Sequence, residues 1–410
     1  MGVQVDWEFF RAQLPSGWRE LASERGLIRP QPPQLRAKVT DIEPVLRLML
    51  HRAGLEASLK TTTGEAAAAD LIDLSGVALH KWERKLGPYL AELTAKLCDA
   101  PTNFAAARWS GYDVFVGDGS AVTRPGAEGT TALVHYILRL STLEFVRCIV
   151  TDEHVGETLR LHEEVAAPGQ LWIIDRGYAN PPGIAAIVWK GPAVIVRYNR
   201  GTLPLYDVEG KPFDVLASVR SLRKPGAIGE WRVWVHPQGG ERIRGRLCAV
   251  RLPDDKVEEA RERLRREYGK DVPAESLEAA SWVMLFTTVP HSRMKAPRVL
   301  ELYRLRWQAE LEAKRDKSIG GLDRLPNFRA DTIATWLQAK LLIQLVAKKI
   351  ASLAEAFPPS VADWNVRALD GSTAPRPRST ARPAHRRRGV ARDAARLRGD
   401  PRRAGLRAAP

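Results

Sequence analysis

Residues 171–178 read LWIIDRGY, in which four apolar residues lead directly into Asp175. An earlier stretch, YDVFVGDGS at 112–120, has a similar arrangement, with a Val-Phe-Val run ahead of Asp118 and a glycine close behind. Short apolar runs are typical of buried strands, and open α/β sheets bind ligands at the carboxyl edge of such strands. If the two strands are neighbours, the two carboxylates converge. For each aspartate alone, the alternative is a turn residue ahead of glycine.

Further short runs rich in apolar and β-branched residues surround these two stretches. They lie at 134–140, 145–150 and 193–196, and amphipathic segments that read as helices lie at 156–165 and 181–190. Hairpin-like strands followed by strands that alternate with helices predict a mixed α/β sheet covered on both faces.

The chain then returns to strand-like patterns, with EWRVWVHP, RIRGRLCAVRLP and SWVMLFTTVP in the segment 201–290. One charged helix at 256–270 interrupts them, so we interpret this segment as a mostly β insertion. A single long helix is predicted from Pro297, because proline is favoured in a first turn, to the glycine pair at 320–321. Another apolar helix is predicted at 332–353.

The N-terminal part of the chain reads as helical. Two short helices at 66–71 and 77–86 are joined by a turn in which Ser75 can cap the second helix. This is the helix-turn-helix pattern, and its second helix would present Lys81 and Arg84 to DNA. An ordinary helical hairpin with a solvated basic face is the alternative.

The predicted long helix contains VLELYRLRWQAELEAKRDKS. On a helical wheel of about 100° per residue, four polar residues fall within about 60° of one another. We call them the polar stripe: Tyr303, Arg306, Glu310 and Lys317. An apolar stripe about 80–90° away is formed by Leu302, Leu305, Ala309 and Ala313. The alternative is a salt-bridged surface helix, since Glu310 has Lys314 four residues on.

Glu310 would complete a three-carboxylate site with Asp118 and Asp175. Three carboxylates without a histidine or cysteine cluster suit Mg²⁺ or Mn²⁺ better than Zn²⁺. Two such ions about 3.5–4 Å apart activate an attacking oxygen and stabilise the leaving oxygen of a phosphodiester displacement. Arg306 and Lys317 beside them would neutralise the phosphate.

Composition and motifs exclude several other classes of protein. The sequence has no GxxxxGK[ST] motif, no GxGxxG after a strand and no HExxH, so nucleotide hydrolysis, dinucleotide binding and zincin chemistry lack support. The three cysteines lie far apart, which argues against a disulfide framework or a zinc finger. No apolar stretch suits a membrane span and the N-terminus has no signal-peptide pattern, so we expect a cytoplasmic protein without a membrane partner. The net charge of +15 indicates a polyanionic partner such as nucleic acid.

The positive charge is concentrated in the last part of the chain. Residues 371–410 contain twelve arginines, two aspartates and no lysine, and no aromatic residue follows Trp364. Such a segment cannot build a core, so we expect 357–410 to be disordered. It is either a nucleic-acid-binding tail or a stretch read out of frame, and the abrupt loss of lysine and aromatic residues favours the second.

The polar stripe has the spacing Y-(2)-R-(3)-E-(6)-K, and this resembles the signature of the bacterial insertion-sequence transposases of family four. Asp118 in VGDGS resembles the first catalytic aspartate of that family, and Asp175 in WIIDRGY resembles the second. The order of regions is similar as well, and the likeness covers about residues 10–355.

The resemblance implies a DDE transposase with a ribonuclease H-like core. It implies that Asp118, Asp175 and Glu310 are catalytic and bind two Mg²⁺ or Mn²⁺ ions, and that the other three residues of the polar stripe contact end phosphates. Strand cleavage would pass through a hairpin at the element end, followed by insertion through transesterification. The implied partners are double-stranded DNA, both the terminal inverted repeats and the target, and a second copy in a dimeric synaptic complex.

The expected organisation has five parts. They are a helical DNA-binding region at 1–105, the first part of the catalytic core at 106–200, a β-rich insertion at 201–292, the C-terminal helices of the core at 293–356 and the tail at 357–410. A stand-alone Mg²⁺-dependent nuclease would share the three carboxylates, and a catalytically idle relic would keep only DNA binding. The polar stripe and the long insertion favour the handling of transposon ends.

Overall fold

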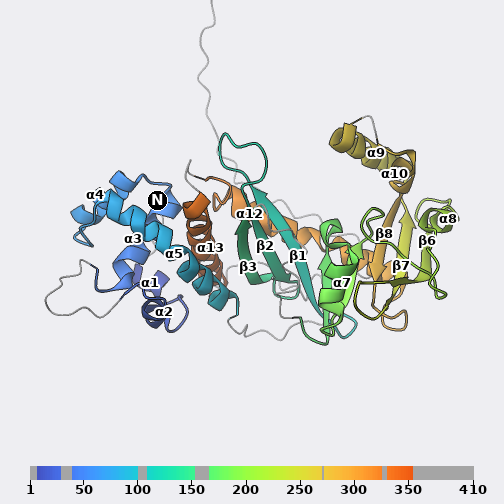
Figure 1. The fold of residues 1–410 in the computed structure, drawn as a ribbon, viewed down its shortest axis with the longest axis horizontal. Helices are drawn as coiled ribbons and strands as arrows, with labels where there is room; N and C mark the ends of the chain where they lie inside the picture. The colour runs from blue at the N-terminus through green and yellow to red at the C-terminus, as the bar shows by residue number, and fades with distance from the viewer. Residues whose placement is uncertain are drawn as a thin grey trace, which may run out of the picture. The chain divides into compact units, whose positions relative to one another are not determined.

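The strands of the described residues form one eight-stranded mixed sheet with the strand order β3-β2-β1-β4-β5-β8-β7-β6 (Figure 1). The structure is a computed structural model, and it describes residues 7–28, 39–99, 109–152, 166–269, 272–325 and 330–353. The strands are β1 Asp113–Val122, β2 Ala132–Arg139, β3 Glu144–Asp152, β4 Gln170–Ile174, β5 Ala193–Arg197, β6 Ile228–Val235, β7 Ile243–Arg251 and β8 Trp282–Thr287. The predicted mixed α/β sheet is confirmed.

Parallel pairing is confined to the middle of the sheet. β4 pairs in parallel with β1 on one side and with β5 on the other, whereas the other neighbouring strands are antiparallel. The carboxyl ends of β1, β4 and β5 therefore point to the same edge of the sheet. In such sheets, this is the edge where ligands bind.

Helices occur before, between and after the strands. The N-terminal helices are α1 Trp7–Arg11, α2 Trp18–Glu24, α3 Ile42–Leu55, α4 Leu59–Ala68 and α5 Gly76–Cys98. The later ones are the short 3₁₀ helix η1 Arg176–Tyr178 and α7 Pro181–Val188, α8 Val215–Val219, α9 Asp254–Tyr268, α10 Ala274–Ala279, α11 Ala296–Arg304, α12 Trp307–Ser318 and α13 Ala330–Leu353. Within the described part of the chain, none of these helices combines the length and the apolar character needed to cross a bilayer.

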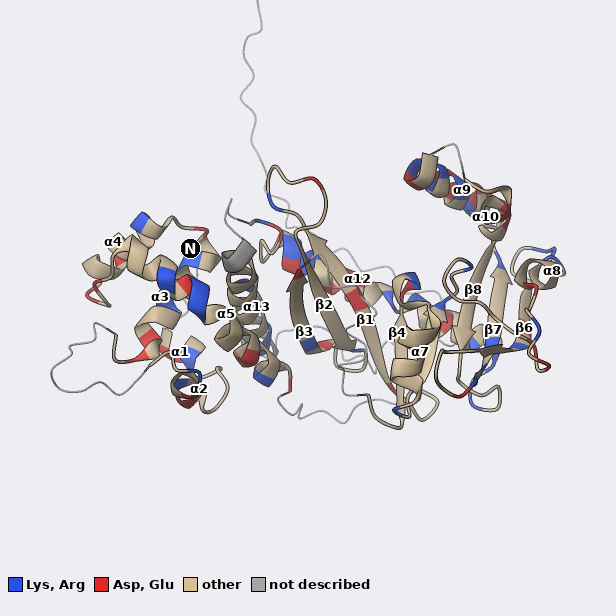
Figure 2. Cartoon of the chain, in the orientation of Figure 1, with Lys and Arg blue, Asp and Glu red and all other residues tan. Residues whose placement is uncertain are grey.

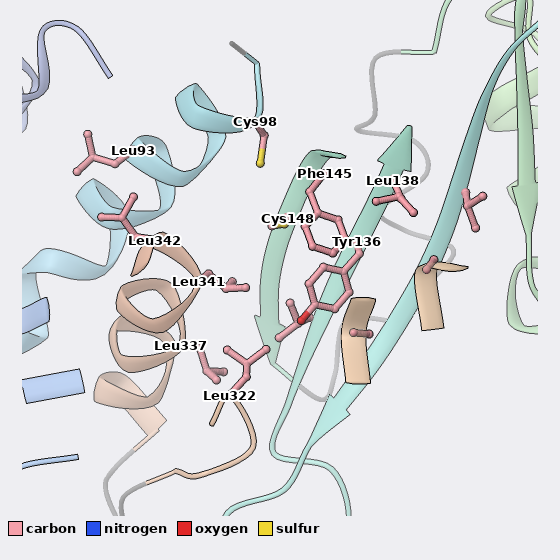
Figure 3. Close-up of a cluster of buried hydrophobic side chains, with 14 of the residues drawn as sticks. Leu93, Cys98, Tyr136, Leu138, Phe145, Cys148, Leu322, Leu337, Leu341 and Leu342 are labelled. Atoms are coloured by element: carbon pink, nitrogen blue, oxygen red, sulfur yellow. The ribbon is translucent and has the colours of Figure 1, made fainter. Parts of the chain in front are cut away.

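The sheet is covered on both faces, as the sequence predicts. Side chains alternate between the two faces of a strand. Val116 of β1 and Ile173 of β4 therefore join the core formed with α5, α12 and α13, whereas Trp172 and Ile174 join the core formed with α7 and α8. Figure 3 shows part of the first core, in which the side chains of Leu337 and Leu341 lie between α13 and Tyr136 of β2.

Two helices joined by a turn are present in the N-terminal region, but their bounds differ from the prediction. The first helix, α4, ends at Ala68, because Asp70 adopts a left-handed backbone conformation with φ 50°. The second helix, α5, continues through Pro88 to Cys98. Its predicted cap is confirmed, since the Ser75 side chain accepts a hydrogen bond from the Ala78 N–H at 3.2 Å.

The segment after β5 contributes both strands and helices. β6, β7 and β8 extend the central sheet through the pairing of β8 with β5. The charged helix predicted at 256–270 corresponds to α9, and the apolar helix predicted at 332–353 corresponds to α13. The helix predicted at 156–165 and the tail at 357–410 lie outside the described residues.

Candidate active site

Two neighbouring strands bring the two predicted aspartates together. β1 and β4 pair in parallel with Gly117 opposite Ile174, so the next residues, Asp118 and Asp175, are side by side. By the alternation of a strand, both carboxylates lie on the face that α12 covers. The expected convergence of Asp118 and Asp175 therefore has a simple origin in the register of two strands.

The strand that carries Asp118 does not end there, contrary to the sequence prediction. β1 continues to Val122, and Asp118 pairs with Tyr136 of the antiparallel neighbour β2. The pairing with β2 extends the strand past the point where β4 stops. Asp175, by contrast, directly follows the last residue of β4 and opens the 3₁₀ turn η1.

The single long helix predicted from Pro297 to the glycine pair is also wrong, because α11 and α12 are separate helices. At the junction, Leu305 and Arg306 donate backbone hydrogen bonds to the carbonyls three residues before them, each at 3.0 Å. Such bonds wind the chain more tightly than an α-helix. The predicted apolar stripe still packs, since Leu302, Ala309 and Ala313 are buried in the core.

Arg306, at this junction, contacts all three predicted carboxylates. Its guanidinium Nη1 lies 3.4 Å from Asp118 Oδ1, its Nε lies 3.7 Å from Asp175 Oδ1, and its Nη2 bonds Glu310 Oε1. The side chains of Arg306 and Asp118 are 14% and 15% exposed, and those of Asp175 and Glu310 are 36% and 38% exposed. Acidic and basic residues accordingly lie close together where α12 passes β1 (Figure 2).

The remaining two residues of the polar stripe point to the same part of the sheet. The Tyr303 hydroxyl donates a hydrogen bond to Asp175 Oδ1 at 3.2 Å, and Lys317 Nζ donates one to the Ala121 carbonyl of β1 at 2.6 Å. Glu310 pairs with Arg306 four residues before it. The stripe therefore lies against the sheet rather than forming a plain salt-bridged surface.

The electrostatics of the site reflect an excess of negative charge. Burial raises the pKa of Asp118 to about 6; Arg306 opposes this shift, whereas the carboxylates of Asp175 and Glu310 add to it. Burial and the nearby Asp175 also raise the pKa of Tyr303 above its usual value. Burial lowers the pKa of Arg306, but the surrounding acidic groups outweigh this and raise it overall. The single positive charge of Arg306 is thus shared by three carboxylates.

The donor set fits a hard cation by its chemistry. Three carboxylates with one counter-charge offer the oxygen ligands that Mg²⁺ and Mn²⁺ prefer. They are not, however, arranged as a metal cage: no group of three or more acidic, histidine or cysteine side chains in the described ranges has that geometry. Instead, the three carboxylates surround Arg306.

Lys81 and Arg84 lie on a different element from the carboxylates. Both are exposed on α5, near its capped N-terminal end, and α5 packs mainly against α13 and β3. The predicted N-terminal DNA contacts and the three carboxylates therefore lie on different secondary-structure elements.

Sequence reasoning missed a set of polar residues behind the site. Lys340, Gln344 and Lys348 recur every four residues in helix α13, and all three contact α12 or the loop that follows it. Their regular four-residue spacing was the only sign in the sequence that they share one face of the helix. Their partners are distant in sequence, so the pattern alone does not identify them.

Two relatives from Escherichia coli have similar sequences. The chain is 31% identical over 333 residues to the transposase for insertion sequence element IS421, which covers 79% of this chain and 89% of the relative. It is also 31% identical over 332 residues to the putative transposase InsL for insertion sequence element IS186A of strain K12, with the same two coverages. No family model matches the chain.

Proposed function

Because the chain belongs to the insertion-sequence transposases, we propose that it catalyses cut-and-paste transposition of DNA with Asp118, Asp175 and Glu310 as its catalytic carboxylates. The observation that carries this proposal is the contact of Arg306 with all three of them. Residues distant in sequence meet at the edge where parallel strands end, which is the usual place for a site in an open sheet.

The fold supports the same assignment. The mixed sheet, with helices on both faces, is compatible with a ribonuclease H-like core formed by 106–200 and 293–356. In this proposal the segment 201–292 is an insertion that extends the core sheet. The helical region at 1–105 binds DNA through Lys81 and Arg84 of α5, which are exposed basic residues beside a capped helix start.

Each residue of the site has a distinct role in the proposed reaction. Asp118, Asp175 and Glu310 would hold two Mg²⁺ or Mn²⁺ ions, which, when bound, activate the attacking oxygen and stabilise the leaving oxygen. Arg306 neutralises the carboxylates in the free protein and binds an end phosphate when DNA is present, since a guanidinium suits both groups. Lys317 binds a neighbouring phosphate.

Tyr303 has a positioning role in this proposal. Its hydroxyl holds Asp175 Oδ1, and its raised pKa keeps the hydroxyl protonated, so it remains a donor at neutral pH. We assign it a contact with the DNA end as well. Cleavage then passes through a hairpin at the element end, and two copies of the chain hold the two ends together. The reaction takes place in the bacterial cytoplasm, on the nucleoid.

An end-cleavage assay tests this proposal. Radiolabelled duplexes carrying the element's own terminal repeats are incubated with the full chain and Mg²⁺, and the products are separated on denaturing gels. We expect a nick at the element boundary, followed by a hairpin that migrates as a covalently closed end. Matched duplexes with scrambled terminal repeats are the control.

The two alternatives give different products in the same assay. A stand-alone nuclease would cut the scrambled duplex as well as the terminal one and would form no joined products. An idle DNA-binding relic would shift the terminal duplex in a gel but leave it intact with either Mg²⁺ or Mn²⁺. Either result would overturn the proposed function.

A further inference from the structure

The face of α12 turned away from the carboxylates is held by polar side chains of α13. Lys340, Gln344 and Lys348 are spaced four residues apart, so they lie on one side of their helix. We call these three residues the α13 ladder. Each step of the ladder contacts α12 or the turn that directly follows it.

The first step lies at the turn after α12. Lys340 Nζ donates hydrogen bonds to the carbonyls of Gly321 at 2.6 Å and Arg324 at 3.2 Å, and it pairs with Glu56 at 2.9 Å. The Lys340 side chain is only 2% exposed. A buried ammonium group is costly unless it is well bonded, so this lysine fixes the turn rather than filling space.

The second step holds the last turn of α12. Gln344 Nε2 donates a hydrogen bond to the Asp316 carbonyl at 3.1 Å, and the same carbonyl accepts a second one from the Leu322 N–H at 3.2 Å. The close approach of the Gln344 amide to the end of α12 depends on Gly320, because a Cβ at this position would lie 1.7 Å from Gln344 Nε2 and 2.8 Å from the Asp316 carbonyl oxygen. A larger residue at position 320 would displace the Gln344 amide from this carbonyl.

The third step reaches further along α12. Lys348 Nζ lies 2.9 Å from Asp316 Oδ1 and 3.2 Å from Glu312 Oε2. Both acidic residues are buried, and at about 100° per residue they lie about 120° and 160° around α12 from Glu310. The same ammonium group also lies 4.1 Å from the centre of the Phe145 ring in β3, which ties the step to the sheet.

The helix that supplies the ladder is itself anchored. Leu337 and Leu341 of α13 are fully buried against the sheet, and Figure 3 shows them on the side of Tyr136. α13 also packs along α5. The ladder therefore connects α12 to a fixed support.

We propose that the α13 ladder sets the rotation of α12 about its own axis, so that Lys348, Gln344 and Lys340 are positioning residues for Glu310 and Lys317. This inference rests on the proposed function for its effect on the reaction. Asp316 is adjacent to Lys317, and Glu312 is two residues from Glu310, so fixing one side of the helix fixes the other. A rotation of about 20° moves a side-chain tip about 6 Å from the helix axis by roughly 2 Å. A misplacement of about 1 Å can reduce a catalysed rate about 100-fold.

The test replaces Lys348 with methionine, which keeps the aliphatic stem and removes both ion pairs with α12. Lys348 is 37% exposed, so the variant is expected to fold. The matched control is Lys349→Met, because Lys349 lies next to it and contacts the Gln13 carbonyl instead. We expect Lys348→Met to slow single-turnover end cleavage at saturating DNA and Mg²⁺ by about 10- to 100-fold, with DNA affinity within about twofold of wild type. Lys349→Met should change neither, and Lys348→Arg should restore most of the rate.

A second measurement is independent of activity. Amide hydrogen exchange of the full chain, without metal or DNA, should become faster in peptides covering 307–318 for Lys348→Met but not for Lys349→Met. Gln344→Leu serves as the second variant and should act in the same direction. Wild-type exchange in α12 for both ladder variants would overturn the inference. If the wild-type chain cleaves no DNA, the proposed function fails, and the exchange experiment still decides the role of the ladder.

Discussion

The two faces of α12 differ in how their charges are balanced. On the face toward the sheet edge, Asp118, Asp175 and Glu310 share the single guanidinium of Arg306. On the opposite face, two acidic residues have two basic partners: Glu312 and Asp316 are paired with Arg315 and Lys348. A balanced set of charges can hold a helix in place by itself, whereas an unbalanced set has capacity for a further cation.

Burial affects both faces, but its consequences differ. It raises the pKa of Asp118 to about 6, and two neighbouring carboxylates add to the shift. It also raises the pKa of Asp316, where Lys348 opposes the shift and only one neighbouring carboxylate, that of Glu312, adds to it. Acids whose pKa is raised by burial and by several neighbouring carboxylates, as at Asp118, are typical of functional sites. Such sites often lower the stability of the fold.

The largest expected effect is on Mg²⁺-dependent end cleavage, and it should appear when a carboxylate is removed from the sheet-edge face but not when one is removed from the opposite face. Glu310→Ala, like Asp118→Ala or Asp175→Ala, should reduce Mg²⁺-dependent end cleavage more than about 1,000-fold, since losing one of the proposed metal ligands would cost several kcal/mol of transition-state stabilisation. DNA affinity should stay nearly unchanged. Glu312→Ala, on the opposite face, should cost about tenfold or less. Equal losses of cleavage for Glu310→Ala and Glu312→Ala would remove the distinction between the two faces.

The second effect concerns the two arginines of α12 and its junction. Arg306→Ala should weaken binding to the terminal duplex about tenfold at 0.1 M salt, and it should lower the slope of log affinity against log salt by about one. Arg315→Ala removes an arginine from the opposite face and should leave the slope unchanged. The measurement is a salt titration by fluorescence anisotropy. Indistinguishable slopes for wild type and Arg306→Ala would contradict a phosphate contact.

The third effect is on stability. The pKa of Asp118 is higher in the folded chain than in the unfolded one, so the protonated carboxyl group favours folding below about pH 4, and this contribution is lost as the group ionises when the pH rises through about 6. Asp118→Asn should therefore stabilise the metal-free protein at pH 7.5 by roughly 2–3 kcal/mol, with the gain shrinking toward pH 4.

Urea unfolding in EDTA between pH 4 and pH 8 measures this difference. Glu301→Gln is the control, because Glu301 is exposed on α11 and pairs with Arg298. An Asp118→Asn variant that is no more stable than wild type at pH 7.5 would show that the site holds no unbalanced charge.

The smallest effect is expected from Lys317. Its Nζ bonds only the Ala121 carbonyl among the contacts found in the described residues, so its removal should leave the carboxylates in place. Lys317→Ala should reduce affinity for the terminal duplex a few-fold and lower the salt slope by about one. Lys314→Ala, an exposed neighbour, is the matched control. A reduced slope for both variants would indicate general attraction rather than a specific contact.

The placement of the candidate site residues could be predicted from the sequence where local pattern decides structure. Asp175 follows an apolar run that forms a strand, and the polar stripe follows helical spacing across α11 and α12. These features depend on a few neighbouring residues, so they can be read from the chain directly. The mixed sheet could be predicted for the same reason.

The errors arose where distant contacts decide structure. β1 passes through Asp118 because β2 pairs with it to Val122, a contact that no local pattern reveals. The turn at Leu305 and Arg306 contains neither proline nor glycine, and both residues favour helices. The α13 ladder was missed because its partners on α12 are about 30 residues away in sequence.

The most direct test asks whether divalent cations bind among the three carboxylates. Fe²⁺ replaces Mg²⁺ in the complex of the full chain with terminal duplex, and ascorbate and peroxide then generate radicals that cut the protein backbone beside the bound ion. We expect three cuts, near Asp118, Asp175 and Glu310, which disappear together in the Asp118→Ala variant and are suppressed by excess Mg²⁺. Cuts at other positions, or the absence of a cut at any one of the three, would contradict this expectation.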